Sequence, residues 1–244
     1  MVPPASSRTA PRKAAKAEAG PALSREAVID RALDVADREG LAAVSIRRIA
    51  QDFGVTPMAL YWHVKNKDEL LAAMGDRVVD AVDLNDLPQD GGLDRLRPLL
   101  QQLVVALARH PGSTELVQFR ILQCPRGQML AEQALTVLAE AGFDLQRRAE
   151  LARAALQSVV MLVVGAPGAE ITVPEPDRQA MRESKQAALA ALPGDHFPQL
   201  VQCSVAMFEC DDPQTYYADG IELFLAGVST LAARRTDQAA SATV

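Results

Sequence analysis

Apolar residues recur at helical spacing along most of the chain after Leu23. The first such run begins after Ser24, whose hydroxyl suits a helix N-cap, and ends at Gly40, which can take the left-handed conformation that stops a helix. Runs of the same period predict further helices near residues 93–109, 114–122, 127–141, 145–165, 177–192, 198–209 and 214–235. We find no alternating strand pattern of convincing length and no internal repeat, so the sequence predicts an all-α fold.

Two short helices are predicted after the first one. Ser45 is a second N-cap residue, and the apolar positions that follow it stop at Gly54. Thr56 is a third N-cap residue, with Pro57 at the first helical position, where a missing N–H does no harm. We expect this third helix to run for about two turns, to His63. The intervening "FGVT" places glycine where the chain turns between two helices, the sequence form of a helix-turn-helix.

Changes in composition divide the chain into parts. A stretch rich in Pro, Ala, Ser, Gly and basic residues precedes the first helix, and it lacks apolar periodicity. Asn66 and Glu69 form a variant of the capping box that would open a longer fourth helix. A Pro/Gly/Asp-rich link, "LNDLPQDGG", follows that helix. We therefore expect a disordered basic arm (1–22), a helix-turn-helix domain with a connecting fourth helix (23–83), a helical C-terminal domain (84–237) and a tail (238–244).

Charge is distributed unevenly along the chain. The net charge is -6, yet residues 1–67 contain eleven Lys/Arg and seven Asp/Glu, a net charge of +4. A basic N-terminal module on an acidic body is the electrostatic pattern of a protein that binds a polyanion at one end. A basic tail without a ligand would give part of the same pattern, because four of the eleven basic residues lie in the first 22.

Composition excludes several classes of protein. The chain has 244 residues and 49% hydrophobic content, which suits a globular protein of one or two domains. Its longest apolar run, near residues 159–164, is too short to span a membrane, and no apolar signal segment follows the basic start, so we expect a cytoplasmic protein. Cys124, Cys203 and Cys210 lack metal-ligand spacing, and we expect buried free thiols, without a metal or another cofactor.

Residues 24–75 carry a more specific pattern. Gly-x-x-x-x-Ser-x-x-x-Ile-Ala runs from Gly40 to Ala50, a Gly-Val turn follows at Gly54, and "LYWHVKNK" runs from Leu60 into an acidic, leucine-containing helix start. This segment resembles the DNA-binding domain of the tetracycline repressor (TetR) family of bacterial transcription regulators. The resemblance covers about a fifth of the chain closely and implies a dimeric DNA-binding regulator, most simply a repressor of a palindromic operator.

The resemblance implies a role for each residue type in the short helices. Arg47 would bind guanine, since its guanidinium matches O6 and N7, and the floor of the major groove would be met by Thr56, Pro57, Met58 and Ala59. The phosphates would be held by Tyr61, Trp62, His63 and Lys67, together with Ser45 and Arg48. Because Pro57, Met58 and Ala59 cannot form bidentate hydrogen bonds, we expect recognition to use thymine methyl groups and Arg47, and the operator to differ from the tetracycline one.

Several of these residues have an alternative role in packing. Leu60 and Val64 are expected in the core of the domain. Trp62 suits either the core or a phosphate contact through its indole N–H. His63 suits a solvated position or a DNA contact, and Lys65 a solvated one.

For the C-terminal domain, the resemblance implies dimerisation and a ligand site. A four-helix bundle would form from residues 145–165 and 214–235 of two subunits, and an alternative is that their apolar stripes are internal core: Leu156, Val159, Val160 and Val163, and Ile221, Leu225 and Val228. Ligand occupancy would change the separation of the two DNA-binding domains.

The ligand itself is expected to be a small apolar or aromatic molecule. Family members that bind a magnesium–drug chelate use histidines, and the matching segments here, "RVVDAVD" and "STELVQFRIL", contain none. Candidate pocket residues are Asp83, which could instead be a solvated surface acid, and six that could instead be plain core: Phe119, Leu122, Gln123, Leu156, Met161 and Met207.

Two other classes of function were weighed. An enzyme is disfavoured because His110 and His196 have no nucleophile at suitable spacing, and "GAPG" is no phosphate-binding loop. A helical small-molecule carrier or adaptor without operator binding fits the C-terminal domain, but it leaves the DNA-facing residue types unexplained.

Overall fold

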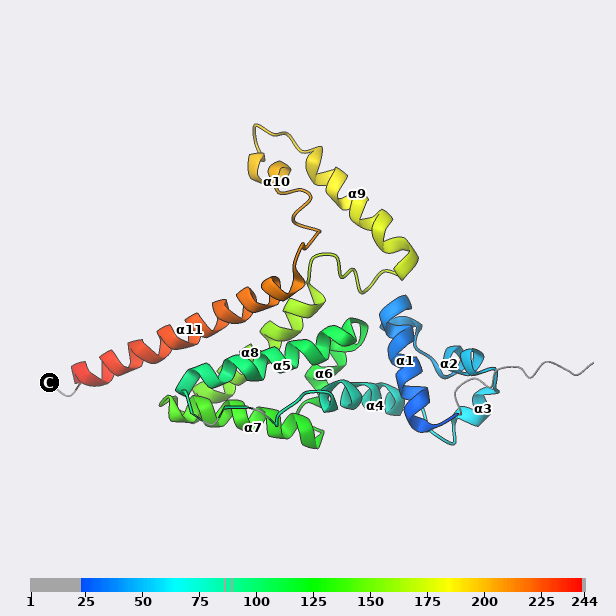
Figure 1. Ribbon diagram of the computed structural model, residues 1–244, viewed down its shortest axis with the longest axis horizontal. Helices are drawn as coiled ribbons and strands as arrows, with labels where there is room; N and C mark the ends of the chain where they lie inside the picture. The colour runs from blue at the N-terminus through cyan, green and yellow to red at the C-terminus, as the bar shows by residue number, and fades with distance from the viewer. Residues whose placement is uncertain (1–22, 86, 89, 243–244) are drawn as a thin grey trace, which may run out of the picture.

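The computed structural model describes residues 23–85, 87–88 and 90–242, with side chains described as far as Arg235. The expected basic arm, residues 1–22, lies outside this range. All secondary-structure elements in the described range are helices, which confirms the predicted all-α fold (Figure 1). The elements are α1 (Arg25–Glu39), η1 (Leu41–Ala43), α2 (Ile46–Phe53), α3 (Pro57–Leu60), α4 (Lys67–Asp80), η2 (Gly92–Arg95), α5 (Leu96–Arg109), η3 (Pro111–Ser113), α6 (Thr114–Arg120), α7 (Pro125–Glu140), α8 (Leu145–Val164), η4 (Glu175–Asp177), α9 (Arg178–Ala190), α10 (Pro198–Gln202) and α11 (Pro213–Ala242).

Three of the expected N-caps form in the helix-turn-helix domain. The side chains of Ser24, Ser45 and Asn66 accept the amide N–H three residues further along, at 3.1, 3.1 and 2.8 Å. Thr56 occupies the N-cap position before Pro57, as expected, but its side chain forms no capping hydrogen bond. Gly54 ends α2 in the left-handed conformation, with φ 65° and ψ 27°, and it lets the chain turn into α3.

Two helices of this domain are shorter than expected. α3 ends at Leu60, where the predicted helix continued to His63, because the His63 N–H bonds to the Leu60 carbonyl at 2.8 Å in a tight turn. α4 ends at Asp80, where we expected Asp83, because Ala81 and Val82 also bond three residues back. The helical period continued past both ends in the sequence, but the backbone had already tightened into turns.

The C-terminal domain has its core between α5, α8 and α11, which pack pairwise against one another (Figure 1). Apolar residues at helical spacing fill this core. Those from the two predicted interface helices are Val159, Val160 and Val163 on α8, and Ile221, Leu225 and Val228 on α11, all buried within one chain. The stripes on which we based the interface are therefore internal core, the alternative role, because α5 covers them.

α9 and α10 stand apart from the rest of the C-terminal domain and contain no buried residue (Figure 1). The helix predicted at 198–209 is only α10, and turns follow it. Cys203 lies in these turns and is exposed, and Cys210 is partly buried, so only Cys124 fits the expected buried thiol. The α9–α10 projection is too exposed to shield them.

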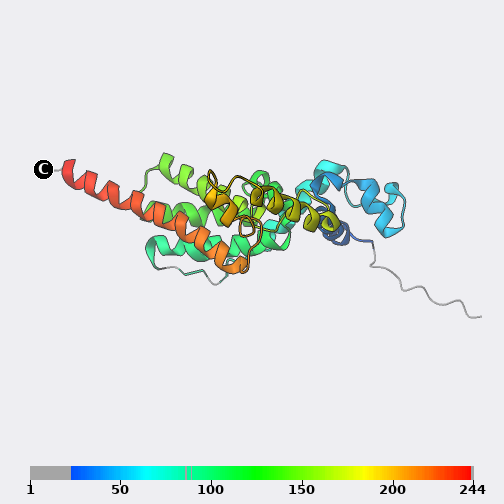
Figure 2. The ribbon, with the colours of Figure 1, turned by 90° about the horizontal axis from the view of Figure 1, so that it is seen from above.

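At the other end of the sequence, α11 continues to Ala242, into the stretch expected to be a tail. Seen from above, α1–α4 lie at one end of an elongated molecule and the end of α11 at the other (Figure 2). Over the described residues, no helix is long and apolar enough to cross a bilayer, and no cluster of three or more His, Cys, Asp or Glu has the arrangement of a metal site.

Candidate nucleic-acid interface and ligand cavity

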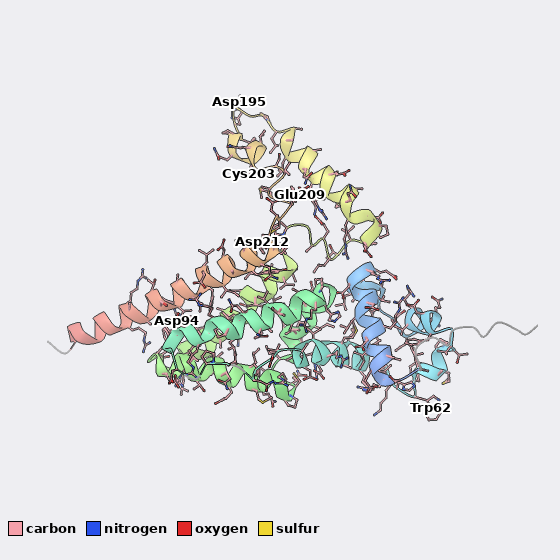
Figure 3. All side chains as sticks on the ribbon, viewed as in Figure 1. Trp62, Asp94, Asp195, Cys203, Glu209 and Asp212 are labelled. Carbon is pink, nitrogen blue, oxygen red and sulfur yellow. The ribbon has the colours of Figure 1, made fainter. Side chains whose placement is uncertain are left out.

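Around the turn after α3, buried and exposed side chains lie next to one another in the sequence. Leu60 and Val64 are fully buried, as expected, and they belong to the hydrophobic core. Between and before them, Met58, Tyr61 and Trp62 are exposed by 69%, 46% and 87%. Figure 3 shows Trp62 at the outer edge of the domain, pointing away from the helices. Because burying a large apolar side chain is normally favourable, this exposed group indicates a contact surface, and it excludes the core alternative for Trp62.

A network of hydrogen bonds fixes the turn that carries Tyr61 and Trp62. Arg25, at the start of α1, donates from Nη1 to the His63 carbonyl at 2.7 Å and to Glu69 Oε1 at 2.8 Å. The other oxygen of Glu69 accepts the Lys65 N–H at 2.9 Å. The Lys65 N–H and then Arg25 lower the pKa of Glu69 below its ordinary value. The Glu69 carboxylate thus reaches the residue before the expected capping-box partner and ties the turn to both α1 and α4.

Arg47 and Arg48 are neighbours on α2 with different surroundings. Arg48 donates to Glu39, from Nη2 at 2.5 Å and from Nε at 3.2 Å, and also pairs with Asp52. Glu39 and then Asp52 raise the pKa of Arg48, and the hydrogen bond from Arg48 is the first cause of the lowered pKa of Glu39. Arg47 is exposed and bonds to no side chain or carbonyl in the described range. Arg47 is therefore free for a ligand, whereas Arg48 is held inside the domain.

The remaining predicted DNA contacts lie on the same domain. Ser45 Oγ accepts the Arg48 N–H, which leaves its hydroxyl proton to donate outward. Thr56, Pro57 and Lys67 are exposed, and Ala59 and His63 are half-buried. Ser45, Arg47 and the α3 residues thus lie in the part of the chain from the start of α2 to α4, which also carries the exposed Trp62.

A cavity of about 480 Å³ lies in the C-terminal domain among α5, α6, α7 and α8. Its wall is mainly apolar, and three of the predicted pocket residues, Phe119, Leu122 and Leu156, contribute to it. The others lie elsewhere. Asp83 accepts the Asn85 N–H beyond α4, Gln123 accepts from Arg120 at 2.6 Å, Met161 is exposed on α8, and Met207 is exposed in the turns after α10.

The cavity wall is joined directly to the helix that carries the DNA-binding domain. Arg120, at the end of α6, donates to both carboxylate oxygens of Asp76 on α4, at 2.8 and 2.9 Å. Gly75 lets the helices approach closely, because a Cβ there would lie 2.7 Å from Arg120 Cγ. The neighbouring Phe119 lines the cavity. A change in the position of α6 would therefore act on α4 through a bidentate ion pair.

Family models match both parts of the chain. The model described as "Bacterial regulatory proteins, tetR family" matches residues 28–74, and "Tetracyclin repressor-like, C-terminal domain" matches residues 85–232. The chain belongs to the TetR family. This confirms the family predicted from residues 24–75, and with it a DNA-binding transcription regulator. The family match also covers the C-terminal domain, where few residues of the sequence pattern indicated the family.

Individual TetR-family proteins are similar over most of their length. The HTH-type transcriptional repressor DrrR1 of Streptomyces coeruleorubidus is 27% identical over 231 residues, which is 90% of this chain and 82% of the relative. The structure of ActR from Streptomyces coelicolor in complex with actinorhodin has a TM-score of 0.63 at 23% identity, covering 86% of this chain and 98% of ActR, and it supports the fold. BioQ with its natural double-stranded DNA operator has a TM-score of 0.50 at 26% identity, covering 75% and 99%.

Sequence reasoning missed Arg25 among the residues that shape the TetR-type surface. Its partner Glu69 is 44 positions away, and no local pattern connects the two. The acidic residue at the start of α4 was visible, but only as part of a capping box. An arginine at the first position of α1, opposite that acid, was the available signal.

Proposed function

We propose that this chain is an operator-binding repressor that acts as a homodimer and leaves its operator when a small molecule occupies the cavity. The observation that carries this proposal is the 87% exposed Trp62, which lies on the same helix-turn-helix domain as the exposed Arg47. An exposed aromatic group of this size has no structural role within the domain. It suits a phosphate-lined groove, where the indole N–H can donate and the ring can pack on sugar.

Recognition would divide between two sets of residues. Tyr61, Trp62 and Lys67 would set the position of the domain on the phosphates, and Arg47 with the apolar tip of α3 would select bases. BioQ, described with its operator DNA, and the repressor DrrR1 support operator binding by a chain of this family. Arg48 is left out of the proposed contact set, because its guanidinium already binds two carboxylates.

Release would begin at the cavity. ActR is described in complex with actinorhodin, which supports a small-molecule effector for a fold of this kind. An effector among α5–α8 would displace α6, and the Arg120–Asp76 pair would transmit the displacement to α4. The effector shifts the equilibrium only by its difference in affinity for the two arrangements.

Selection of bound sequences from random DNA duplexes by the full chain tests the proposal. We expect an enriched palindrome whose half-sites lie about 34–36 Å apart, one helical turn. Trp62→Ala should weaken binding to that palindrome on the order of tenfold, without a change in thermal unfolding. Phe197→Ala, which removes an exposed aromatic residue near α10, is the matched control and should bind as the unmodified chain does.

The competing function, a small-molecule carrier, gives the opposite results. A carrier would enrich no palindrome even at low salt, and its duplex affinity would not fall with rising salt as counterion release requires. Either result would contradict the proposal that this chain binds an operator.

A further inference from the structure

The polar groups on the wall of the cavity indicate the charge of its ligand. Within the part of the chain that the structure describes, seventeen residues line the cavity, and of these Arg153 is the only one with an ionisable side chain. The other polar members are two glutamines, Gln118 and Gln157. No carboxylate of the described residues contributes to the lining, in a chain whose acidic residues outnumber the basic ones by 31 to 25.

The geometry of α8 places the cation beside an amide. Arg153 and Gln157 are four residues apart, so they occupy one edge of the helix, one turn from each other. The inner edge of the same turns is apolar, with Ala152, Ala155 and Leu156 in the wall. α6 contributes Phe119 and the turn after it contributes Leu122, and these two side chains are 73% and 66% exposed. The cavity therefore has an apolar body with hydrogen-bond donors on one edge.

The donors on this edge have no partner within the described part of the chain. Arg153 forms no ion pair or hydrogen bond there, and neither do the side chains of Gln118 and Gln157. The contrast on the same helix is Arg147, which donates to Glu150 at 3.0 Å. Arg153 is exposed, and its guanidinium has no carboxylate partner among the described residues.

We infer that the effector of this cavity is an organic anion: an apolar, aromatic-sized skeleton that bears a carboxylate or an equally ionised oxygen, bound by Arg153 with Gln157 beside it. This inference rests on the proposed effector role of the cavity and adds the chemical class of the ligand. The cavity volume of about 480 Å³ lies in the range of small-molecule sites. A cationic ligand would meet Arg153 with no carboxylate in the wall, whereas an anion gains charge-assisted hydrogen bonds from the planar guanidinium.

A pair of probes of equal shape tests the sign of the charge. Anthracene-2-carboxylate and anthracene-2-carboxamide share the ring system and differ in charge, and their fluorescence reports binding to the full chain. We expect the carboxylate to bind on the order of tenfold more tightly than the carboxamide. Arg153→Gln should remove this preference by weakening the carboxylate alone.

Two control variants locate the effect. Phe119→Ala should weaken both probes by a similar factor, because the ring would contact either skeleton in this cavity. Arg147→Gln removes an arginine from the same helix that does not line the cavity, and it should leave both affinities unchanged.

Each other result contradicts the inference. Equal affinities for the two probes, or an Arg153→Gln variant that weakens both equally, would show that the arginine is only a solvated surface residue. No binding of either probe would remove the aromatic anion as the ligand class. Operator binding is measured on the same preparation. A chain that preferred the carboxylate but bound no palindrome would contradict the proposed repressor function and leave the ligand class standing.

Discussion

Arg47 and Arg48 have the same side chain and adjacent positions, and their neighbours give them different roles. Sequence reasoning assigned both to DNA, because only residue type and position in the motif were visible. Glu39 and Asp52, which hold Arg48, are nine residues before it and four after it, and they come from two helices. Spatial pairing of this kind decides whether a cation is available to a phosphate.

Arg47→Ala should cost about 1–3 kcal/mol of operator binding and relax specificity at one base position in each half-site. Arg48→Ala should instead lower the free energy of unfolding by about 1 kcal/mol, because Glu39 loses its arginine partner and Asp52 keeps only Arg31. Operator titration and thermal unfolding of both variants distinguish the roles. Equal loss of operator affinity with unchanged unfolding in both variants would return Arg48 to the DNA contacts.

The Glu39–Arg48 pair also predicts a dependence of stability on pH. The pKa of Glu39 is lowered in the folded chain, so the folded state binds its proton less readily than the unfolded state does. This contribution is present above the unfolded pKa of about 4.3 and is lost as the pH falls through the lowered folded value. Urea unfolding between pH 3 and 7, as an approximate window, should therefore give a shallower acid limb for Glu39→Gln. Glu183→Gln, an exposed glutamate of α9, is the control, and equal limbs for all three chains would contradict the assignment.

At the scale of elements, the end of α1 is joined to the C-terminal domain by backbone contacts that leave no room for a side chain. Gly112 in η3 donates its N–H to Asp37 Oδ1 at 2.9 Å, and the other oxygen of that carboxylate lies 2.9 Å from His110 Nδ1. Arg178 donates to the Asp37 carbonyl, one of the last carbonyls of α1, which lack partners within the helix. η3 and the start of α9, which are far apart in the sequence, therefore both contact α1 at Asp37.

Gly112→Ala should lower the free energy of unfolding by about 2–3 kcal/mol. The added Cβ would lie 2.3 Å from the Ala36 carbonyl oxygen, so the backbone of η3 or of α1 must move. Gly194→Ala is the matched control, since its Cβ would meet nothing within 4 Å. Chemical unfolding of the two variants makes the comparison, and a neutral Gly112→Ala would mean that the junction is looser than these contacts indicate.

At the scale of elements, the sequence predicted the features that depend only on residues a few positions apart. Ser24, Ser45 and Asn66 were identified as caps because each bond spans three residues, and Gly54 because its turn requires a positive φ. The short α10 and the early end of α3 were missed, since their helical periods continue past the point where the backbone tightens. The wall of the cavity was predicted only in part, at Phe119, Leu122 and Leu156. Met161 has the same apolar character but is exposed, and only packing distinguishes it from those three residues.

At the scale of the whole molecule, the proposed dimer must use surfaces that the single chain leaves exposed. The apolar stripes of α8 and α11 fill the core, so a partner would contact the opposite edges of these helices. Those edges carry large exposed apolar residues, Leu223 on α11 and Met161 on α8, at 77% and 61% exposure. One chain presents one helix-turn-helix domain, whereas a palindromic site about one DNA turn long needs two.

Leu223→Glu should therefore convert the chain from dimer to monomer and reduce operator affinity at least about a hundredfold, because a buried charge at the interface has no partner and the two half-sites are no longer bound together. Light scattering during size-exclusion chromatography gives the mass, and operator titration gives the affinity. Met129→Glu, which places the same charge at a half-exposed position on α7, should stay dimeric and bind as before. If Leu223→Glu remained a dimer with full affinity, the interface would have to lie away from α11. If it became a folded monomer that still bound the palindrome tightly, a single domain would suffice, and the symmetry of the operator would need another cause.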